Sequence, residues 1–251
     1  MNQWINWKAC IAAYVLVILV NALANIIPIG GLNTGQVSAL YPSLFTPAGY
    51  VFAIWSLIYL WLTGFVVYQA RAEQRERPLI QAIRVPFVYG CLANASWIFV
   101  WHYQLIALAM LAIAALLWFN YRCYQLIQGA ELTRQDKLWL AAPISLYLGW
   151  IAVANIANIS SLQTAWDLND FLFNAIQWTW LKLALAGSVA AWFLLKRDDV
   201  IIPLVVLWAA AGIAVKQAAT PEVSGAAATL TLLSAILCGY YLSCRWSRSR
   251  E

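Results

Sequence analysis

The stretch FTPAGYVFAIWSLIYLWLTGF, residues 45–65, carries no charged side chain and is almost wholly apolar. About 20 apolar residues in a helix cross the hydrocarbon core of a bilayer. Similar runs recur along the 251-residue chain, which is 64% hydrophobic and only 10% charged, whereas soluble domains carry about a quarter charged residues. The runs lack the alternation of barrel strands. The sequence therefore predicts an all-α polytopic transmembrane helix bundle, with the lipid bilayer as its first partner.

Eight stretches are predicted to span the membrane as helices. The first has a weak basic flank, with Lys8 alone, which favours a retained helix over a cleaved signal peptide. The second is expected to begin at Pro47, because Thr46 suits the N-cap and proline suits the first helical position. The eight spans cover about residues 9–27, 47–69, 85–102, 104–126, 138–159, 171–195, 200–216 and 226–243.

The basic residues predict the orientation of these helices, because cytoplasmic loops carry an excess of Lys and Arg. With eight spans and an inner N-terminus, every basic residue except Lys182 and Lys216 falls on the inner side. Both termini are therefore expected in the cytoplasm, and the membrane is expected to be a bacterial inner membrane. The charge of +5 follows from this topology. No dense basic tract follows a nucleic-acid backbone, so nucleic acid is not expected as a partner.

Aromatic and amide side chains recur at helical spacing within three of the predicted spans. Residues spaced i, i+3 and i+7 share one helix face, and mid-span amides require hydrogen-bond partners inside a bundle. Packing and a ligand pocket are both compatible with this spacing. Tryptophans near the span ends suit the membrane interface instead, namely Trp4, Trp7, Trp139 and Trp246. The mid-span sets are Phe52, Trp55 and Tyr59; Asn94, Trp97 and Trp101; and Tyr147, Trp150 and Ala154, with Asn158 one turn further.

Three stretches together resemble the TspO/MBR family, the tryptophan-rich sensory or translocator proteins. They are YPSLFTPAGYVFAIWSLIYL (residues 41–60), LANASWIFVW (92–101) and PISLYLGWIAVANIAN (143–158). The resemblance covers about residues 8–160 and implies a five-helix membrane core over residues 1–160. Residues 161–251 lie beyond it and are expected to form a three-helix membrane extension.

The resemblance also implies a function, because helices of that family surround an aromatic-lined cavity for flat apolar ligands. Aromatic rings suit such ligands because they stack on flat surfaces. This chain departs from the family in one loop: Tyr41 replaces a lysine, Ala48 replaces a second proline, and NTGQVSAL (33–40) replaces a Trp-Tyr pair of the porphyrin pocket. The predicted binding residues are Pro47, Phe52, Trp55, Tyr59, Asn94, Trp97, Trp101, Tyr147, Trp150 and Asn158.

Lys182 is added to this set, because it is the one charged residue well inside a predicted span. A charge at that depth costs at least ~2.5 kcal/mol and usually marks a functional site. Lys182 would pair with a carboxylated ligand. Alternatively, it faces a water-filled crevice, or its side chain snorkels to the membrane interface. His102, the single histidine, is interpreted as a solvated residue at a helix end in preference to a haem ligand.

No nucleophile–base pair, metal-ligand cluster, P-loop or dinucleotide motif is present in the sequence, so no catalytic or metal-binding residue is predicted. The first hypothesis is a non-enzymatic receptor or carrier for a flat hydrophobic ligand of tetrapyrrole, sterol or carotenoid type. A tetrapyrrole is the one cofactor-like molecule implied. The alternatives are a secondary transporter of a small hydrophobic or anionic solute, and a structural subunit of a homodimer or larger membrane complex.

Overall fold

The computed structural model describes residues 5–248, with the side chains of residues 246–248 excepted. Within these residues every regular element is helical, as predicted. The long helices are α1 (Trp7–Ile26), α3 (Ile54–Gln69), α5 (Pro78–His102), α6 (Ile106–Gln128), α8 (Ala142–Ala165), α9 (Ala175–Arg197), α10 (Ile201–Lys216) and α11 (Pro221–Arg248). The short ones are η1 (Ile29–Gly31), α2 (Thr34–Ala39), η2 (Gly49–Ala53), α4 (Ala72–Arg75), α7 (Arg134–Asp136) and the π-helical turn η3 (Lys137–Ala141).

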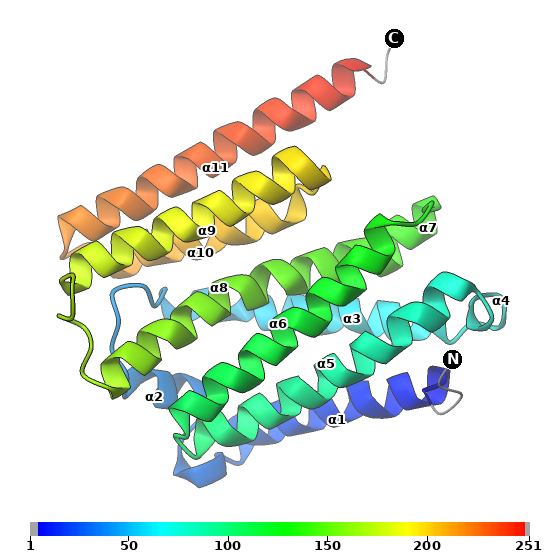
Figure 1. Cartoon of the computed structure of the whole chain (residues 1–251), viewed down its shortest axis with the longest axis horizontal. Coiled ribbons are helices and arrows are strands. Elements are labelled where there is room, and N and C mark those ends of the chain that lie inside the picture. Colours follow the sequence, from blue (N-terminus) through cyan, green and yellow to red (C-terminus); the bar gives the residue numbers. More distant parts are fainter. Residues whose placement is uncertain (1–4, 249–251) are drawn as a thin grey trace. The chain divides into compact units, whose positions relative to one another are not determined.

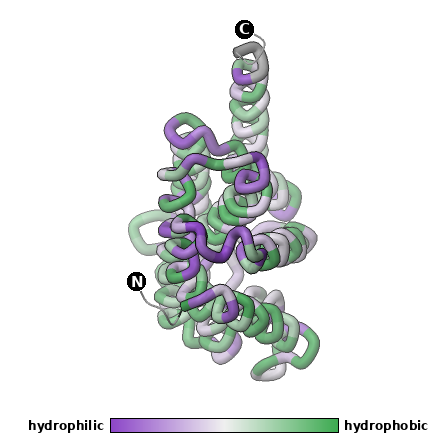
Figure 2. The backbone as a smooth tube through the Cα atoms, turned by 90° about the vertical axis from the view of Figure 1, so that its right-hand side faces the viewer, coloured by the Kyte–Doolittle hydropathy of each residue, from purple (hydrophilic) through white to green (hydrophobic). Residues whose placement is uncertain are grey.

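Seven of the described helical segments are long and apolar enough to cross a membrane. The eighth predicted span corresponds to α10, which has 16 residues and is apolar but shorter. Figure 2 shows that hydrophobic residues run along the helices, whereas hydrophilic residues gather in the connections between them. The structure therefore agrees with a polytopic membrane bundle.

The first of two compact units contains the residues up to Pro42 together with Ala53–Trp166. Its five long helices form a closed bundle, because α5 packs between α1 and α6, α8 packs between α6 and α3, and α1 packs against α3 (Figure 1). Every residue from Ala142 to Ile151 in α8 is buried, including Tyr147 and Trp150. The core of this unit therefore lies along α8.

Local sequence explains where several helices of this unit begin. The Asn6 side chain accepts hydrogen bonds from the backbone amides of Lys8 and Ala9 and so caps α1. Asn33 and Gln36 form a capping box at the start of α2. Such side chains satisfy amides that have no partner within the helix. The capping box stabilises a short helix in the loop of residues 28–42, and this helix packs against α5.

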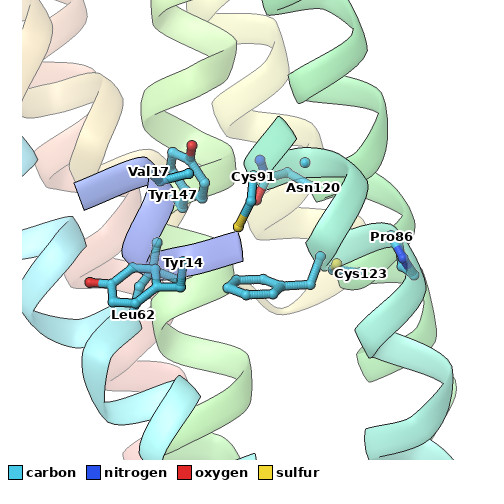
Figure 3. A pocket seen from close by; sticks show the side chains of 10 residues that line it. Tyr14, Val17, Leu62, Pro86, Cys91, Asn120, Cys123 and Tyr147 are labelled. Carbon is cyan, nitrogen blue, oxygen red and sulfur yellow. The ribbon is translucent and has the colours of Figure 1, made fainter. Parts of the chain in front are cut away.

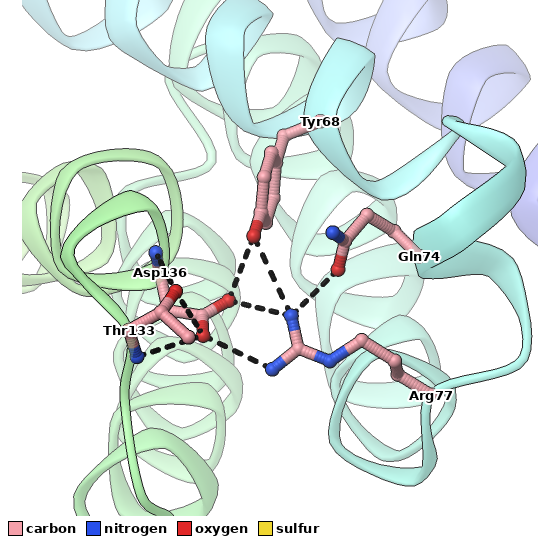
Figure 4. A network of polar contacts seen from close by, with 5 residues as sticks. All are labelled: Tyr68, Gln74, Arg77, Thr133 and Asp136. Carbon is pink, nitrogen blue, oxygen red and sulfur yellow. Dashed lines mark hydrogen bonds and ion pairs between the residues drawn. The ribbon is translucent and has the colours of Figure 1, made fainter.

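A polar cluster joins the ends of three segments of the first unit (Figure 4). Asp136, fully buried at the end of α7, accepts two hydrogen bonds from the Arg77 guanidinium, at 2.8 and 3.0 Å. It also accepts bonds from the Tyr68 hydroxyl at 3.0 Å and the Thr133 hydroxyl at 2.8 Å. Bidentate, charge-assisted bonds of this kind are among the stronger polar contacts. They tie the end of α3 and the start of α5 to the segment that leads into α8.

Trp139, which the sequence places at the membrane interface, also packs against α3. Its side chain lies on Gly64 of α3, where an added β-carbon would stand 2.4 Å from the indole Cζ3 atom. The absence of a side chain at Gly64 therefore lets the π-helical turn pack against α3. Trp4 and the side chain of Trp246 lie outside the described residues.

The second unit contains α9, α10 and α11, which pack against one another, together with residues 43–52. An α-helix does not begin at Pro47, so the prediction of that start was wrong. The Ala48 amide donates to the Gly212 carbonyl of α10 at 3.1 Å, a 3₁₀ turn follows at Gly49–Ala53, and α3 starts only at Ile54. Contact with α10 thus replaces the first turn of the expected helix.

Candidate functional site

Four aromatic side chains of the first unit form one contact cluster, called here the aromatic cluster: Trp55 and Tyr59 of α3 with Tyr147 and Trp150 of α8. The Trp55 ring stacks on Tyr59, with centroids 5.5 Å apart and planes at 18°. It meets Tyr147 and Trp150 edge-on at 6.2 and 5.9 Å. Such offset and edge-on geometries are the favourable ones for aromatic pairs. Two predicted stripes from separate helices therefore meet.

Hydrogen bonds from side chains of α1 and α5 hold the aromatic cluster in place. The Asn94 amide of α5 donates to the Tyr147 hydroxyl at 2.7 Å, and its oxygen accepts from Asn21 Nδ2 of α1 at 2.8 Å. The Tyr14 hydroxyl of α1 donates to the Tyr59 carbonyl and lies 2.9 Å from the Thr63 hydroxyl. Because polar groups inside a membrane bundle need partners, these bonds fix how α1, α3, α5 and α8 meet.

The third predicted stripe forms a separate pair on α5. The Trp97 indole N–H donates to Asn158 Oδ1 of α8 at 3.1 Å. Its ring stacks on Trp101, with centroids 5.7 Å apart, and the Trp101 indole N–H donates to the Thr34 carbonyl at 3.3 Å. Both tryptophans are buried. Asn94 and Asn158 thus find partners within the bundle.

His102 is 2% exposed, so its interpretation as a solvated helix end was wrong. Its Nδ1 donates to the Ile98 carbonyl at 2.7 Å, and its Nε2 lies 3.4 Å from the Thr34 hydroxyl. The residues of α2 fold over this end of α5 and exclude water from the imidazole. A haem iron would have to displace Thr34 to reach Nε2.

A small cavity lies at the centre of the five-helix bundle (Figure 3). Its volume is about 10 Å³, which is about the space that one water molecule needs. Tyr147 of the aromatic cluster borders it, together with polar groups of Tyr14 and Asn120. A flat ligand therefore does not fit into this cavity unless the helices separate. The remaining lining residues are Val17, Leu62, Pro86, Phe87, Gly90, Cys91 and Cys123.

Three predicted site residues belong to the second unit. Pro47 is buried and Phe52 is exposed. Lys182 of α9 is only 9% exposed. The α9 helix begins at Ala175, four residues later than the predicted span, so Lys182 lies nearer to its start than expected.

The sequence prediction missed two polar residues of α1 that hydrogen-bond to predicted site residues. Asn21 and Tyr14 both lie within the first predicted span, and both bond to site residues. Asn21 could have been predicted as an interior residue, because it is an amide within an apolar span, as Asn94 is. Within the described residues no group of three or more His, Cys, Asp or Glu side chains is placed to hold a metal ion.

These features define a polytopic α-helical membrane protein whose interior contains hydrogen-bonded aromatic and amide side chains. The model of the TSPO-like protein family matches residues 3–240, and the chain belongs to that family. The matched residues include those of α9 and α10 and most of α11. No curated protein and no solved structure matches the chain.

Proposed function

We propose that this TSPO-like membrane protein is a receptor or carrier for a flat hydrophobic ligand, and that it catalyses no reaction. The observation that supports this function is the aromatic cluster, in which Trp55 contacts three other rings at centroid distances of 5.5–6.2 Å. A planar apolar ligand gains stacking area on such rings, which are already ordered and lose little entropy on binding.

The half-buried faces of Trp55 and Tyr59 are the contact surface in this proposal. The centre of the bundle is closed, with about 10 Å³ of free volume, whereas pockets for drug-sized ligands measure about 300–1,000 Å³. The ligand therefore stacks on these two rings, or it separates Trp55 from Trp150 to enter. Tyr147 is held in place by Asn94 and forms the fixed wall of the site.

The proposed ligand is a flat, apolar molecule such as a tetrapyrrole, a sterol or a carotenoid. The loop at residues 33–40 lacks the Trp-Tyr pair expected of a porphyrin pocket. Instead it forms α2, whose Thr34 bonds to Trp101. A flat ring system with few polar groups suits the aromatic cluster independently of this loop.

Tryptophan-fluorescence titration of the purified chain with protoporphyrin IX, cholesterol and β-carotene tests this function. We expect saturable binding of at least one ligand. Trp55→Ala should weaken it by roughly 1–3 kcal/mol, the usual loss when a stacking ring is removed. Trp118→Ala is the matched control, because Trp118 lies on α6 and is 57% exposed. Equal losses in both variants, or no saturable binding at all, would contradict the proposal.

A secondary transporter is the second candidate, supported by Lys182. A buried cation within a membrane helix is costly and commonly lies on a solute pathway, and Lys182 is 9% exposed. Counterflow of a carboxylated solute in liposomes would favour this function over simple binding. In either case we place both termini in the cytoplasm and the chain in a bacterial inner membrane.

A further inference from the structure

Three helix ends of the first unit meet around one glutamine. Gln69, the last residue of α3, donates from Nε2 to the Trp7 carbonyl at the start of α1, at 3.2 Å. Its side-chain oxygen accepts from Arg84 Nε at 3.1 Å, and its carbonyl accepts from another Arg84 nitrogen at 3.4 Å. Because α1, α3 and α5 are membrane-spanning segments, their ends lie at the border between hydrocarbon and lipid headgroups.

Cations surround this junction. The Arg75 guanidinium lies over the Trp7 ring, 4.1 Å from the centroid, and Lys8 Nζ lies 5.5 Å from it. Arg84 is 5% exposed. Within the described part of the chain its guanidinium donates to Gln69 alone, through two of the five N–H groups that a guanidinium offers. Trp7, Lys8, Gln69, Arg75 and Arg84 are called here the Trp7 cluster.

Among the residues that the structure describes, no carboxylate forms an ion pair with the Trp7 cluster. The ion pair of this region joins Arg77 to Asp136, outside the cluster. The acidic residues of the same connection are Glu73 and Glu76, and Glu76 accepts from Gln81 at 3.1 Å. The Glu76 carboxylate acts on Arg84 only from beyond ion-pair distance. The three cations Lys8, Arg75 and Arg84 therefore leave a net positive charge at the level of the lipid headgroups.

We propose that the Trp7 cluster binds the phosphate of an anionic glycerophospholipid. Arginine is suited to phosphate because its planar fork donates two parallel hydrogen bonds. An interfacial tryptophan beside basic residues matches the depth of a headgroup, and juxtamembrane cations attract anionic lipids. The lipid phosphate would accept from Arg75 and Lys8 and compensate the charge of the buried Arg84. This proposal does not depend on the ligand of the aromatic cluster.

Lipid retention by the purified full-length chain tests the proposal. Native mass spectrometry would count bound phosphatidylglycerol and phosphatidylcholine in the wild type and in Arg75→Gln and Arg84→Gln variants. We expect phosphatidylglycerol affinity to fall about tenfold in either variant, the effect of one lost charge-assisted bond. Arg75→Gln tests the proposal by itself if Arg84→Gln does not fold, because Arg75 is not fully buried.

Arg122→Gln is the matched control, since Arg122 lies over Trp118 at 6.0 Å, bonds to Gln125 and is exposed on α6. It should retain phosphatidylglycerol like the wild type. Equal retention in all variants, or equal affinity for phosphatidylcholine and phosphatidylglycerol, would overturn the proposal. Displacement of the lipid by millimolar inorganic phosphate would also overturn it, because a free anion would then be the ligand.

Discussion

Gly212 of α10 and Val51 approach so closely that a β-carbon added to Gly212 would stand 2.1 Å from Cγ2 of Val51 and 3.3 Å from Cβ of Pro47. The approach brings the Gly212 carbonyl to the Ala48 amide, at 3.1 Å. It also lets the Trp208 indole N–H donate to the Val51 carbonyl at 3.0 Å. Residues 43–52 are thus fastened to α10 by a contact that only glycine permits.

Gly212→Ala should therefore destabilise the protein. The new methyl group must displace Val51, whose β-branched side chain has few alternative rotamers. Overpacking of this kind costs about 1–3 kcal/mol. The change is measured as a fall in the thermal unfolding midpoint of the purified protein in one detergent.

Gly225→Ala of α11 is the control, because a β-carbon there meets no atom within 4 Å. It should be neutral or stabilising by up to ~1 kcal/mol, the difference in helix propensity. Val51→Ala should restore much of the loss when combined with Gly212→Ala. Equal midpoints for the two glycine variants would show that the close approach does not exist in solution.

The start of α3 shows what the sequence could not predict. Thr46 and Pro47 are locally suitable for a helix start, yet the Ala48 amide bonds to Gly212, which lies 164 positions further along the chain. Local propensity is overridden by such a tertiary contact. The helical class and the approximate spans were predictable, because hydropathy acts locally and the bilayer sets the length.

The residues of the candidate site could be predicted from the sequence, but the contacts between them could not. Spacing placed Trp55 and Trp150 on helix faces, and the edge-on contact between them depends on how α3 and α8 pack. The sequence shows that Asn94 needs hydrogen-bond partners. It does not show that Asn21 is one of them, because that contact depends on how α1 packs against α5. The burial of His102 was not predicted, because it depends on the helix α2. The glycine-containing sequence of that loop did not indicate a helix.

The Arg77–Asp136 pair should be important for stability. Asp136→Asn removes the charge that Arg77 faces and leaves the guanidinium and the Tyr68 hydroxyl with weaker acceptors. Loss of one partner of a buried pair costs about 3–5 kcal/mol, and the partial exposure of Arg77 places the expected loss near the lower end. Glu131→Gln, an exposed carboxylate on the same connection, should leave the unfolding midpoint unchanged. If both variants unfold alike, the cluster of Figure 4 contributes little.

The predicted orientation has a direct test. Reporter fusions that distinguish cytoplasm from periplasm, placed at residues 1 and 251, should both report the cytoplasm. A fusion in the connection at residues 167–170 should report the periplasm. A periplasmic signal from the C-terminal fusion would mean that the 16-residue α10 does not cross the membrane, so that α11 runs in the opposite direction.

Lys182→Met tests whether the second unit takes part in ligand binding. If Lys182 pairs with a ligand carboxylate, the variant should bind protoporphyrin IX more weakly, by roughly 1.5–3 kcal/mol for one lost charge-assisted bond. The dimethyl ester has the same ring without the charges, so its affinity should be unchanged. Lys216→Met, at the exposed end of α10, is the control and should affect neither ligand. The deciding quantity is the acid-to-ester ratio of dissociation constants from the fluorescence titration. If this acid-to-ester ratio is the same in Lys182→Met and the wild type, Lys182 is a structural residue. If the ratio also changes in Lys216→Met, the effect is a general one of surface charge.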